Sequence, residues 1–344
     1  MKLFFHKLTH WEYWPYQVVY LPVYFQYIYY ILKTRSFFYF SASNPTIKNG
    51  GFFMESKMEI YDLIPKKYYP TTLFIKQNEV LDTVLDKILK NQRSFPCIAK
   101  PDAGLRGTAV QKIEGISDLK KYIEKANFDY LTQNLIPYEN EIGLFYVRYP
   151  NQKNGTITGI VKKEFLSVTG DGKSTIKELI LKNKRAAFQL KILETEMESE
   201  INTVLKTGEY KILVPYGNHC RGAKFIDDSN NITPKLIETI DRVCKQINGF
   251  YYGRLDLMFE SYEQLEKGEN FQIVEINGAI SEPTHIYDPA HSLLFGWKTL
   301  LKHFKHMSQI SIENHKKGIA YLTTNQGIIE WKKHHSHYNK ILNF

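Results

Sequence analysis

The sequence predicts an α+β protein made of two or three packed subdomains. Its 344 residues are enough to bury a sizeable core, and 43% hydrophobic with 24% charged residues is ordinary for a globular chain. Between residues 55 and 277, segments with apolar residues at helical spacing are interspersed with short apolar runs typical of strands. We therefore expect mixed helices and strands throughout this stretch.

The first forty residues differ from the rest. From Tyr13 to Leu32 no side chain is charged, and tyrosine dominates. The stretch reaches the length of a membrane-spanning helix, at about 20 residues, but Pro15 and Pro22 interrupt it, and Tyr and Trp prefer the membrane interface. No small-residue cleavage site follows, which argues against a signal peptide. Three alternatives stay open: packing against the protein itself, an interfacial segment on a membrane, and a true span.

The remaining elements follow in order. The aromatic run 37–40 is expected to be a strand, and the Asn-Pro and Gly-Gly pairs within 41–51 mark a loop. A basic, polar tail is expected after about residue 314. Helices are expected at 55–64, 80–90, 118–125 and 234–247, with a charged, helix-prone stretch at 174–206. Strands are expected at 71–75, 95–100, 108–113, 130–136, 142–148, 157–164, 253–259 and 271–276.

Charge and cysteine usage narrow the function classes. The net charge of +9 suits nucleic acid, anionic lipid or a polyanionic substrate. Because no helix-turn-helix or finger accompanies the charge, we expect no nucleic-acid partner and favour nucleotide phosphates with an anionic substrate or membrane surface. Cys97, Cys220 and Cys244 form no C-x-x-C pair, which favours a cytoplasmic setting and argues against a thiolate zinc site.

The sharpest chemical signal lies on the last two expected strands. Asp256 lies on one strand, and Glu275 and Asn277 lie on the next, so carboxylate and amide oxygens can converge on a hard cation. Magnesium is the expected ion, with manganese as the alternative, because it takes a few protein oxygens together with substrate phosphates. Arg254 shares a face with Asp256 through the i, i+2 relation and is expected to contact a phosphoryl group as a catalytic residue. The alternative is two edge strands with solvent-facing acids.

A second signal follows the strand at 95–100. Lys100 ends that strand and can meet a phosphate, while the next turn presents backbone N–H groups. Gly104 and Gly107 would let the backbone approach closely, with Arg106 between them. This is no Walker A loop, because no Gly-Lys-Ser/Thr opens a helix here. A plain turn is the alternative.

A third segment, at residues 133–141, is expected to bind the nucleoside. Its backbone would pair with an adenine edge and an acid beyond it would accept the ribose hydroxyls; a plain surface loop is the alternative. The hinge residues are Gln133, Asn134, Leu135 and Ile136, and the ribose acid is Glu141, with Glu139 as its rival.

The order of these features resembles the ATP-grasp superfamily over residues 52–305, in particular D-alanine–D-alanine ligase and the cyanophycin synthetase and glutathione synthetase-like ligases. The segment 169–179 is similar to one that cyanophycin synthetase-type enzymes carry between two central strands. The resemblance implies an ATP-grasp fold, in which two α+β subdomains clasp ATP. The implied parts are an aromatic N-terminal segment in place of the usual pre-ATP-grasp domain (1–51), a small subdomain with the phosphate loop (52–136), a large subdomain with the metal site (137–310) and the basic tail (311–344).

The resemblance also implies residue roles. Lys57 is similar to the family's first phosphate-binding lysine and Lys100 to its second. Arg221 lies where relatives place groups that face the acyl phosphate. His285, near the acceptor, is expected either to be a base for the attacking amine or to be a hydrogen-bonded loop histidine, and a base must lie within reach of its proton.

Together these features predict an ATP-dependent carboxylate–amine ligase that forms an amide through an acyl phosphate and releases ADP and phosphate. The alternatives are a kinase, a ligase with a hydroxyl or thiol acceptor, and a membrane-associated nucleotide-binding scaffold. Expected substrates are small-molecule or lipid-linked carboxylates and amines. Further expectations are peripheral membrane contact through residues 11–40 at the inner face of the membrane, and a homodimer.

Overall fold

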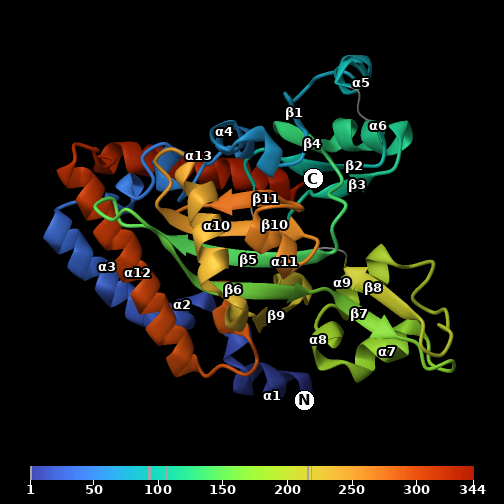
Figure 1. Cartoon of the computed structure of the whole chain (residues 1–344). Helices are drawn as coiled ribbons and strands as arrows, with labels where there is room; N and C mark the ends of the chain where they lie inside the picture. The colour runs from blue at the N-terminus through green and yellow to red at the C-terminus, as the bar shows by residue number, and fades with distance from the viewer. Residues whose placement is uncertain (1, 92–93, 105–106, 215–216, 218) are drawn as a thin grey trace.

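The computed structural model describes residues 2–91, 94–104, 107–214, 217 and 219–344. It contains antiparallel sheets flanked by helices (Figure 1), which confirms the predicted α+β class. A four-stranded sheet and a five-stranded sheet hold the predicted chemical residues. A third, two-stranded sheet forms a separate lobe.

The four-stranded sheet has the order β1-β4-β2-β3. Helices α5 (Leu81–Lys90) and α6 (Ile116–Lys125) share an apolar core with it. Side chains alternate across a strand, and Cys97 and Ala99 belong to this core, so Lys100 points to the opposite face. The strands are β1 (Thr72–Ile75), β2 (Cys97–Pro101), β3 (Gln111–Ile113) and β4 (Tyr130–Asn134).

The five-stranded sheet has the order β11-β10-β5-β6-β9, and every described pair is antiparallel. One face packs on α10 (Pro234–Lys245) and α11 (Tyr262–Lys267) through the largest apolar core of the molecule. The other face packs on α12 (Leu293–Lys316), which contacts the N-terminal region in turn. The strands are β5 (Asn140–Val147), β6 (Thr156–Glu164), β9 (Lys224–Asp227), β10 (Tyr252–Phe259) and β11 (Phe271–Asn277).

The lobe between β6 and β9 has a core of its own. The helix-prone stretch forms three short helices here, and the flanking strands and β9 were not predicted. Thr175 starts the first helix with a capping box to Glu178. The elements are β7 (Leu166–Thr169), α7 (Ile176–Lys182), α8 (Lys184–Ala187), α9 (Leu190–Glu196) and β8 (Tyr210–Val214).

The N-terminal region is helical, with α1 (Lys2–Thr9), α2 (Tyr16–Val19) and α3 (Leu21–Thr34). The predicted strand at 37–40 is wrong, because Tyr39–Ala42 form a 3-10 turn whose aromatic rings are buried against α12 and α3. Among the described residues, no helix combines the length and apolar character that a membrane span requires. The N-terminal aromatic segment packs against the rest of the protein through the rings of Tyr39 and Phe40 and through the inner face of α3.

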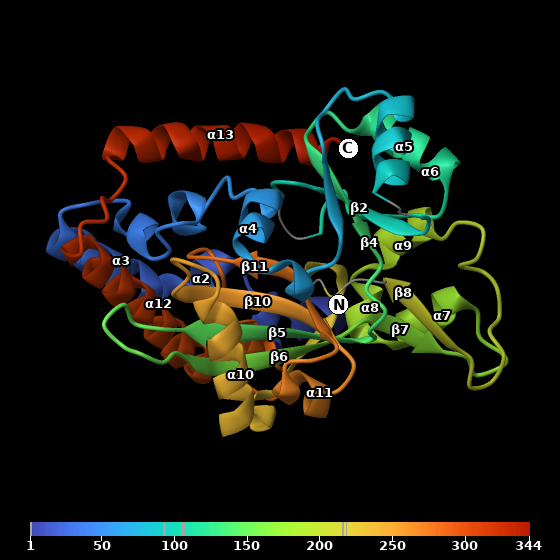
Figure 2. The same cartoon turned by 45° about the horizontal axis from the view of Figure 1, so that its top comes forward.

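A 19-residue helix occupies most of the stretch where we expected a tail. α13 (Thr324–Leu342) starts with a capping box between Thr323 and Gln326. It runs from the N-terminal helices to the four-stranded sheet (Figure 2), where Ile341 joins the core of that sheet. The boundary at 136/137 between two subdomains remains a proposal; β4 ends at Asn134 and β5 begins at Asn140.

Candidate active site

Four of the predicted residues lie on two alternate rungs of the β10–β11 pair, on either side of the Leu255–Ile276 rung. Arg254 is directly opposite Asn277, and Asp256 is directly opposite Glu275. Side chains on opposed residues of an antiparallel pair point to the same face, and so do side chains two residues apart on one strand. The four side chains therefore share one face. Gly143 on β5 lies opposite Asp256, and a Cβ there would come within 3.0 Å of Asp256 Oδ1.

Asp256 is buried and held by two cations. Arg254 donates to it from Nε (2.9 Å) and a terminal nitrogen (3.1 Å), and Lys163 Nζ lies 3.5 Å from Oδ2. Burial alone would raise the pKa of Asp256, but Arg254 and Lys163 outweigh it and the pKa is lowered. The group is therefore a carboxylate at neutral pH, as a metal ligand must be.

Glu275 is paired with Lys57, whose Nζ lies 3.3 Å from Oε1. Lys57 opens α4 (Lys57–Leu63), and Asp102 fixes this end because its Oδ1 accepts from Met58 N at 2.9 Å. Burial works against the charge of Lys57, but Glu275 more than offsets it, so the pKa is raised. The lysine also donates to the carbonyl of Gly104 at 3.2 Å, which ties it to the predicted phosphate loop.

Lys100 projects from β2 towards β11 and is buried. Its Nζ donates to Tyr61 Oη and Gln133 Oε1, both at 2.9 Å, and to the carbonyl of Val274 at 3.2 Å. None of these partners is anionic, and burial lowers the pKa of Lys100 to about 7, although Glu275 pulls it upward. At neutral pH the Lys100 amine is therefore only partly charged, and an anionic ligand beside it would favour the ammonium form.

The predicted adenine and ribose residues have mixed surroundings. The Gln133 side chain donates to Thr72 Oγ1 (2.8 Å) and Tyr61 Oη (3.1 Å), and its strand is paired on both sides within the sheet. Asn134 ends β4, and Leu135 and Ile136 follow in a loop. Glu139 is exposed, and Glu141 Oε1 accepts from Lys163 at 2.6 Å.

The predicted phosphate loop is described in part. Gly104 packs beneath Pro101 and Ile341, and Gly107 has a positive φ of 70°. Arg106 lies outside the described residues. The loop is anchored at its start, where the Asp102 carbonyl accepts from Lys57 N at 3.0 Å.

The two remaining catalytic candidates lie elsewhere. Arg221 donates to Glu196 of α9 at 2.6 Å, on the lobe side. His285 is buried in the 3-10 turn Thr284–Tyr287, and a Cβ on Gly159 would lie 2.2 Å from its ring. Burial lowers the pKa of His285 to about 4. This environment favours a packed histidine over a base for the acceptor.

Sequence reasoning missed three residues of the site. Tyr61 accepts hydrogen bonds from Lys100 and Gln133, and Lys163 lies beside the carboxylates of both Glu141 and Asp256. Glu55 precedes α4, and its Oε2 is buried without a hydrogen-bond partner. Burial, followed by the charge of Glu275, raises the pKa of Glu55 to about 7. The adjacent Ser56-Lys57 pair was the one sequence signal near it.

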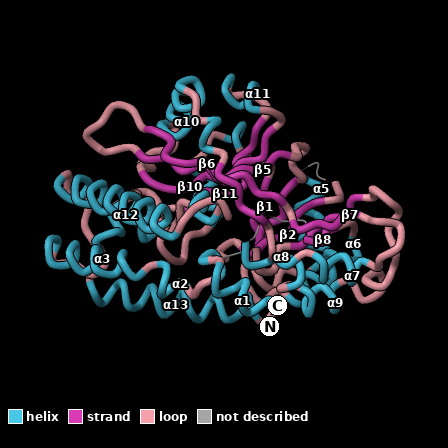
Figure 3. The backbone as a smooth tube through the Cα atoms, turned by 90° about the horizontal axis from the view of Figure 1, so that it is seen from below, coloured by secondary structure: helices cyan, strands magenta, loops and turns pink. Residues whose placement is uncertain are grey.

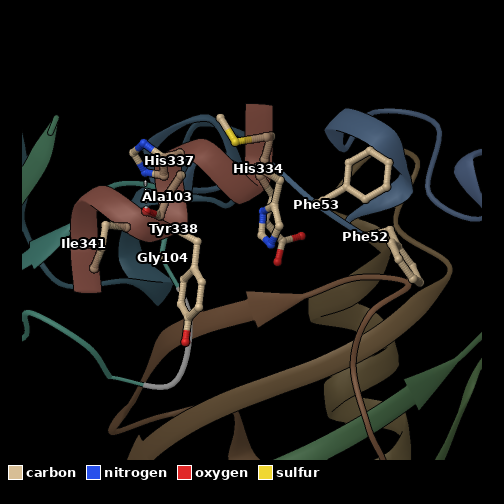
Figure 4. Close-up of a pocket in the computed structure, with 10 residues that line it drawn as sticks. Phe52, Phe53, Ala103, Gly104, His334, His337, Tyr338 and Ile341 are labelled. Atoms are coloured by element: carbon tan, nitrogen blue, oxygen red, sulfur yellow. Dashed lines mark hydrogen bonds between the residues drawn. The ribbon is translucent and has the colours of Figure 1, made fainter. Parts of the chain in front are cut away.

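A pocket adjoins the site on the side of α13 (Figure 4). The loop before α4, the start of the phosphate loop and α13 line it, and His337 Nε2 lies 2.8 Å from the carbonyl of Ala103. Glu55 and Gly104 belong both to this pocket and to the surroundings of Lys57 and Glu275. The lining residues are Phe52, Phe53, Met54, Glu55, Ala103, Gly104, His334, His337, Tyr338 and Ile341.

The donor set fits a hard divalent cation. Asp256 and Glu275 supply carboxylate oxygens, and Asn277, on the same face, supplies an amide oxygen. Among the described residues, no group of three or more His, Cys, Asp or Glu is placed to hold a metal. Phosphate oxygens would therefore have to complete the coordination, which is how magnesium usually binds.

No family model matches the sequence. The chain is 25% identical over 137 residues to the glutathione biosynthesis bifunctional protein GshAB of Clostridium perfringens, covering 35% of this chain and 18% of that protein. A bifunctional glutathione synthetase from Pasteurella multocida is 15% identical over 76% of this chain and 38% of its own, with a TM-score of 0.39. D-alanine–D-alanine ligase from Bacillus anthracis is 14% identical over 76% of this chain and 69% of its own, with a TM-score of 0.42.

Over part of its length, the chain is thus similar to a curated glutathione biosynthesis protein. It spans less than a fifth of the length of the curated relative and well under half of the glutathione synthetase chain. At these TM-scores the superpositions do not decide the fold, which the strand orders and registers above describe.

Proposed function

We propose that this chain is an ADP-forming carboxylate–amine ligase of the ATP-grasp type, which activates a carboxylate as an acyl phosphate and transfers the acyl group to an amine. The carrying observation is the shared face of Arg254, Asp256, Glu275 and Asn277, towards which Lys57 projects from the start of α4 and Lys100 from β2 of the other sheet. The two carboxylates and the amide suit a metal ion, and the three cations beside them suit phosphates. The site therefore suits a metal–nucleotide complex better than it suits a metal ion or a nucleotide alone.

In this proposal the cations bind and orient the nucleotide. Lys57 and Lys100 hold its phosphates, and Arg254 meets the transferring phosphoryl group, whose charge must be stabilised in the transition state. Asp256, Glu275 and Asn277 hold magnesium, or manganese, which screens phosphate charge when bound. The hinge 133–136 faces the base, and Glu139 or Glu141 accepts the ribose. The present Glu141–Lys163 ion pair would have to rearrange for Glu141 to do so.

Transfer then proceeds in two balanced steps. A carboxylate oxygen attacks the γ-phosphorus, the bond to the β,γ-bridging oxygen breaks, and ADP leaves with that oxygen. The amine nitrogen attacks the acyl carbon, and the C–O bond breaks to release phosphate, with the amine proton passing to solvent or a base. Exclusion of water protects the acyl phosphate between the steps.

We place the acceptor amine in the pocket beside Glu55 (Figure 4). The buried Oε2 of Glu55 has no hydrogen-bond partner in this structure, and an ammonium group would supply a donor. Glu55 is flanked by Glu275 and Lys57, so an amine held there would lie close to the phosphate-binding cations. The carboxylate and amine are proposed to be small or lipid-linked molecules, and the setting to be cytoplasmic.

The test is ADP release screened over amino acids, peptides and lipid-linked acids, with mass detection of the condensed product. We expect release that depends on both a carboxylate and an amine, and its loss in Asp256→Ala/Glu275→Ala. Glu263→Ala/Glu269→Ala, which removes two exposed acids, is the matched control and should keep activity. Substrate-stimulated release that survives in the double variant would sink the assignment.

The same screen separates the alternatives. A kinase or a ligase with a hydroxyl or thiol acceptor would yield a phosphorylated, ester or thioester product without any amine. A nucleotide-binding scaffold would bind ATP and release no ADP with any member of the screen.

A further inference from the structure

The outer face of α3 is an uncharged apolar surface that none of the described elements covers. Six of its side chains recur at i, i+3 and i+4 spacing and are 40–74% exposed. Figure 1 shows α3 on the outside of α12, at the edge of the molecule. The six residues are Leu21, Tyr24, Phe25, Ile28, Tyr29 and Leu32.

This face is not needed to hold the helix in place. The opposite face of α3 carries Val23 and Tyr30, which are buried, and Tyr30 packs with Phe304 of α12. Trp297 of α12 donates to the carbonyl of Val19 at 3.0 Å and anchors the start of the helix. Since the inner face already provides the packing, an apolar outer face of this size indicates a partner.

The same character continues along the chain towards the N-terminus. Figures 1 and 3 show α3, α2 and α1 following one another along one side of the molecule. Exposed apolar side chains occur in both preceding helices, each 43–63% exposed: Phe4, Phe5 and Leu8 in α1, and Tyr16 and Val18 in α2. We call these five residues and the six of α3 the apolar strip.

Exposed cations flank the apolar strip. Lys33 and Arg35 lie exposed at the C-terminal end of α3. On the neighbouring α12 an exposed lysine recurs at i, i+4 and i+7, at Lys298, Lys302 and Lys305. Glu12 is the one acid in the first 54 residues, and it is buried in ion pairs with Arg185 and His219.

We propose that the apolar strip is a membrane-interface surface, which lies on an anionic lipid bilayer with the lysines of α12 and the end of α3 at the headgroups. Tyr, Phe and Leu on one face with Lys and Arg at its edge is the composition of an interfacial helix, since aromatic rings are favoured at the headgroup level. A second copy of this chain fits less well, because a two-fold interface through the strip would bring the cations of both copies together.

The surface is coupled to the candidate site. Tyr20, between α2 and α3, donates from its hydroxyl to Glu282, which also accepts from Tyr287 at 3.2 Å and is among the charges acting on Arg254. A bilayer that binds the apolar strip would therefore lie near Tyr20, which contacts Glu282 beside the candidate site. This inference does not depend on the proposed ligase chemistry.

The test is co-sedimentation of the full chain with vesicles of phosphatidylcholine, with and without phosphatidylglycerol. We expect pelleting with the anionic vesicles, and a partition coefficient at least tenfold lower in Phe25→Ser/Ile28→Ser/Leu32→Ser. The matched control is Leu181→Ser/Val204→Ser/Ile212→Ser, which removes three similarly exposed side chains from the separate lobe and should bind as the parent does.

A charge variant keeps the test decisive if the serine variant folds poorly. Lys298→Gln/Lys302→Gln/Lys305→Gln should lose binding to anionic vesicles several-fold and become less sensitive to salt. The proposal is overturned if the parent does not pellet with anionic vesicles, or if the first and control variants lose binding equally. It is also overturned if the parent is a dimer that the serine variant dissociates, with no vesicle binding by either.

Discussion

Binding of a nucleotide should take up a proton at Lys100. In the unliganded protein this lysine donates to two side chains and a carbonyl, none of them charged, and burial lowers its pKa to about 7. A pKa lowered from 10.5 to about 7 corresponds to about 5 kcal/mol of free energy against the charged form. A phosphate at Nζ would restore the charge, because an adjacent anion favours the ammonium form.

The size of the uptake follows from the pH. At pH 8 a group with a pKa of about 7 is about one-tenth charged, so binding should take up about 0.9 proton per site; at pH 7 the value is about 0.5. Isothermal titration calorimetry with MgADP in buffers of different ionisation enthalpy measures this number directly. Lys100→Arg, which stays charged throughout, should bind with no uptake.

A stability measurement provides a second readout. The unfolded chain binds the Lys100 proton up to about pH 10.5 and the folded chain only up to about pH 7. The unliganded protein should therefore gain stability from this group as pH rises through that window, and Lys100→Met should raise Tm at pH 7 while weakening nucleotide binding. Equal proton uptake in the parent and in Lys100→Arg, or none in the parent at pH 8, would refute the reasoning.

Three further outcomes are expected. Glu55→Gln should raise KM for the amine at least tenfold with little change in the ATP constant; equal effects on both would remove Glu55 from the acceptor site. The pKa of His285 is lowered to about 4, so the unfolded chain binds the proton of this histidine first as pH falls from 6.5. Between pH 7 and pH 5 the parent should therefore lose about 2 kcal/mol more unfolding free energy than His285→Gln loses, as measured by urea titrations. Ile341→Ala should cost about 2–5 kcal/mol and expose α13 amides to hydrogen exchange, because that buried side chain anchors the helix to the four-stranded sheet; unchanged α13 protection would contradict this anchoring.

Local sequence patterns were enough to predict the two strands that carry the candidate metal ligands. Arg254 and Asp256 are separated by one residue, as are Glu275 and Asn277, so any antiparallel pairing in this register puts all four on one face. Lys100 could likewise be placed from the end of its strand. These signals depend on the alternation of side chains along a strand and on the spacing of residues a few positions apart. Both can be read from a single sequence.

The missed features depend on contacts between distant segments. Glu55, Tyr61 and Lys163 acquire their surroundings from β11, β4 and β10, and nothing next to them in sequence indicates this. The aromatic run at 37–40 has strong strand propensity, but burial against α12 and α3 determines its conformation instead. α13 was mistaken for a tail because its apolar positions are few, although Thr323 and Gln326 form a capping box that could have indicated it.

The central claim is that ATP is cleaved by a carboxylate and not by water. The most direct measurement is the reaction of the parent protein with MgATP and its active carboxylate–amine mixture in water enriched in oxygen-18, followed by mass spectrometry of the phosphate. The account predicts unlabelled phosphate equal in amount to ADP, because its fourth oxygen comes from the carboxylate. Phosphate that carries one solvent oxygen, or ADP formed without phosphate, would contradict it.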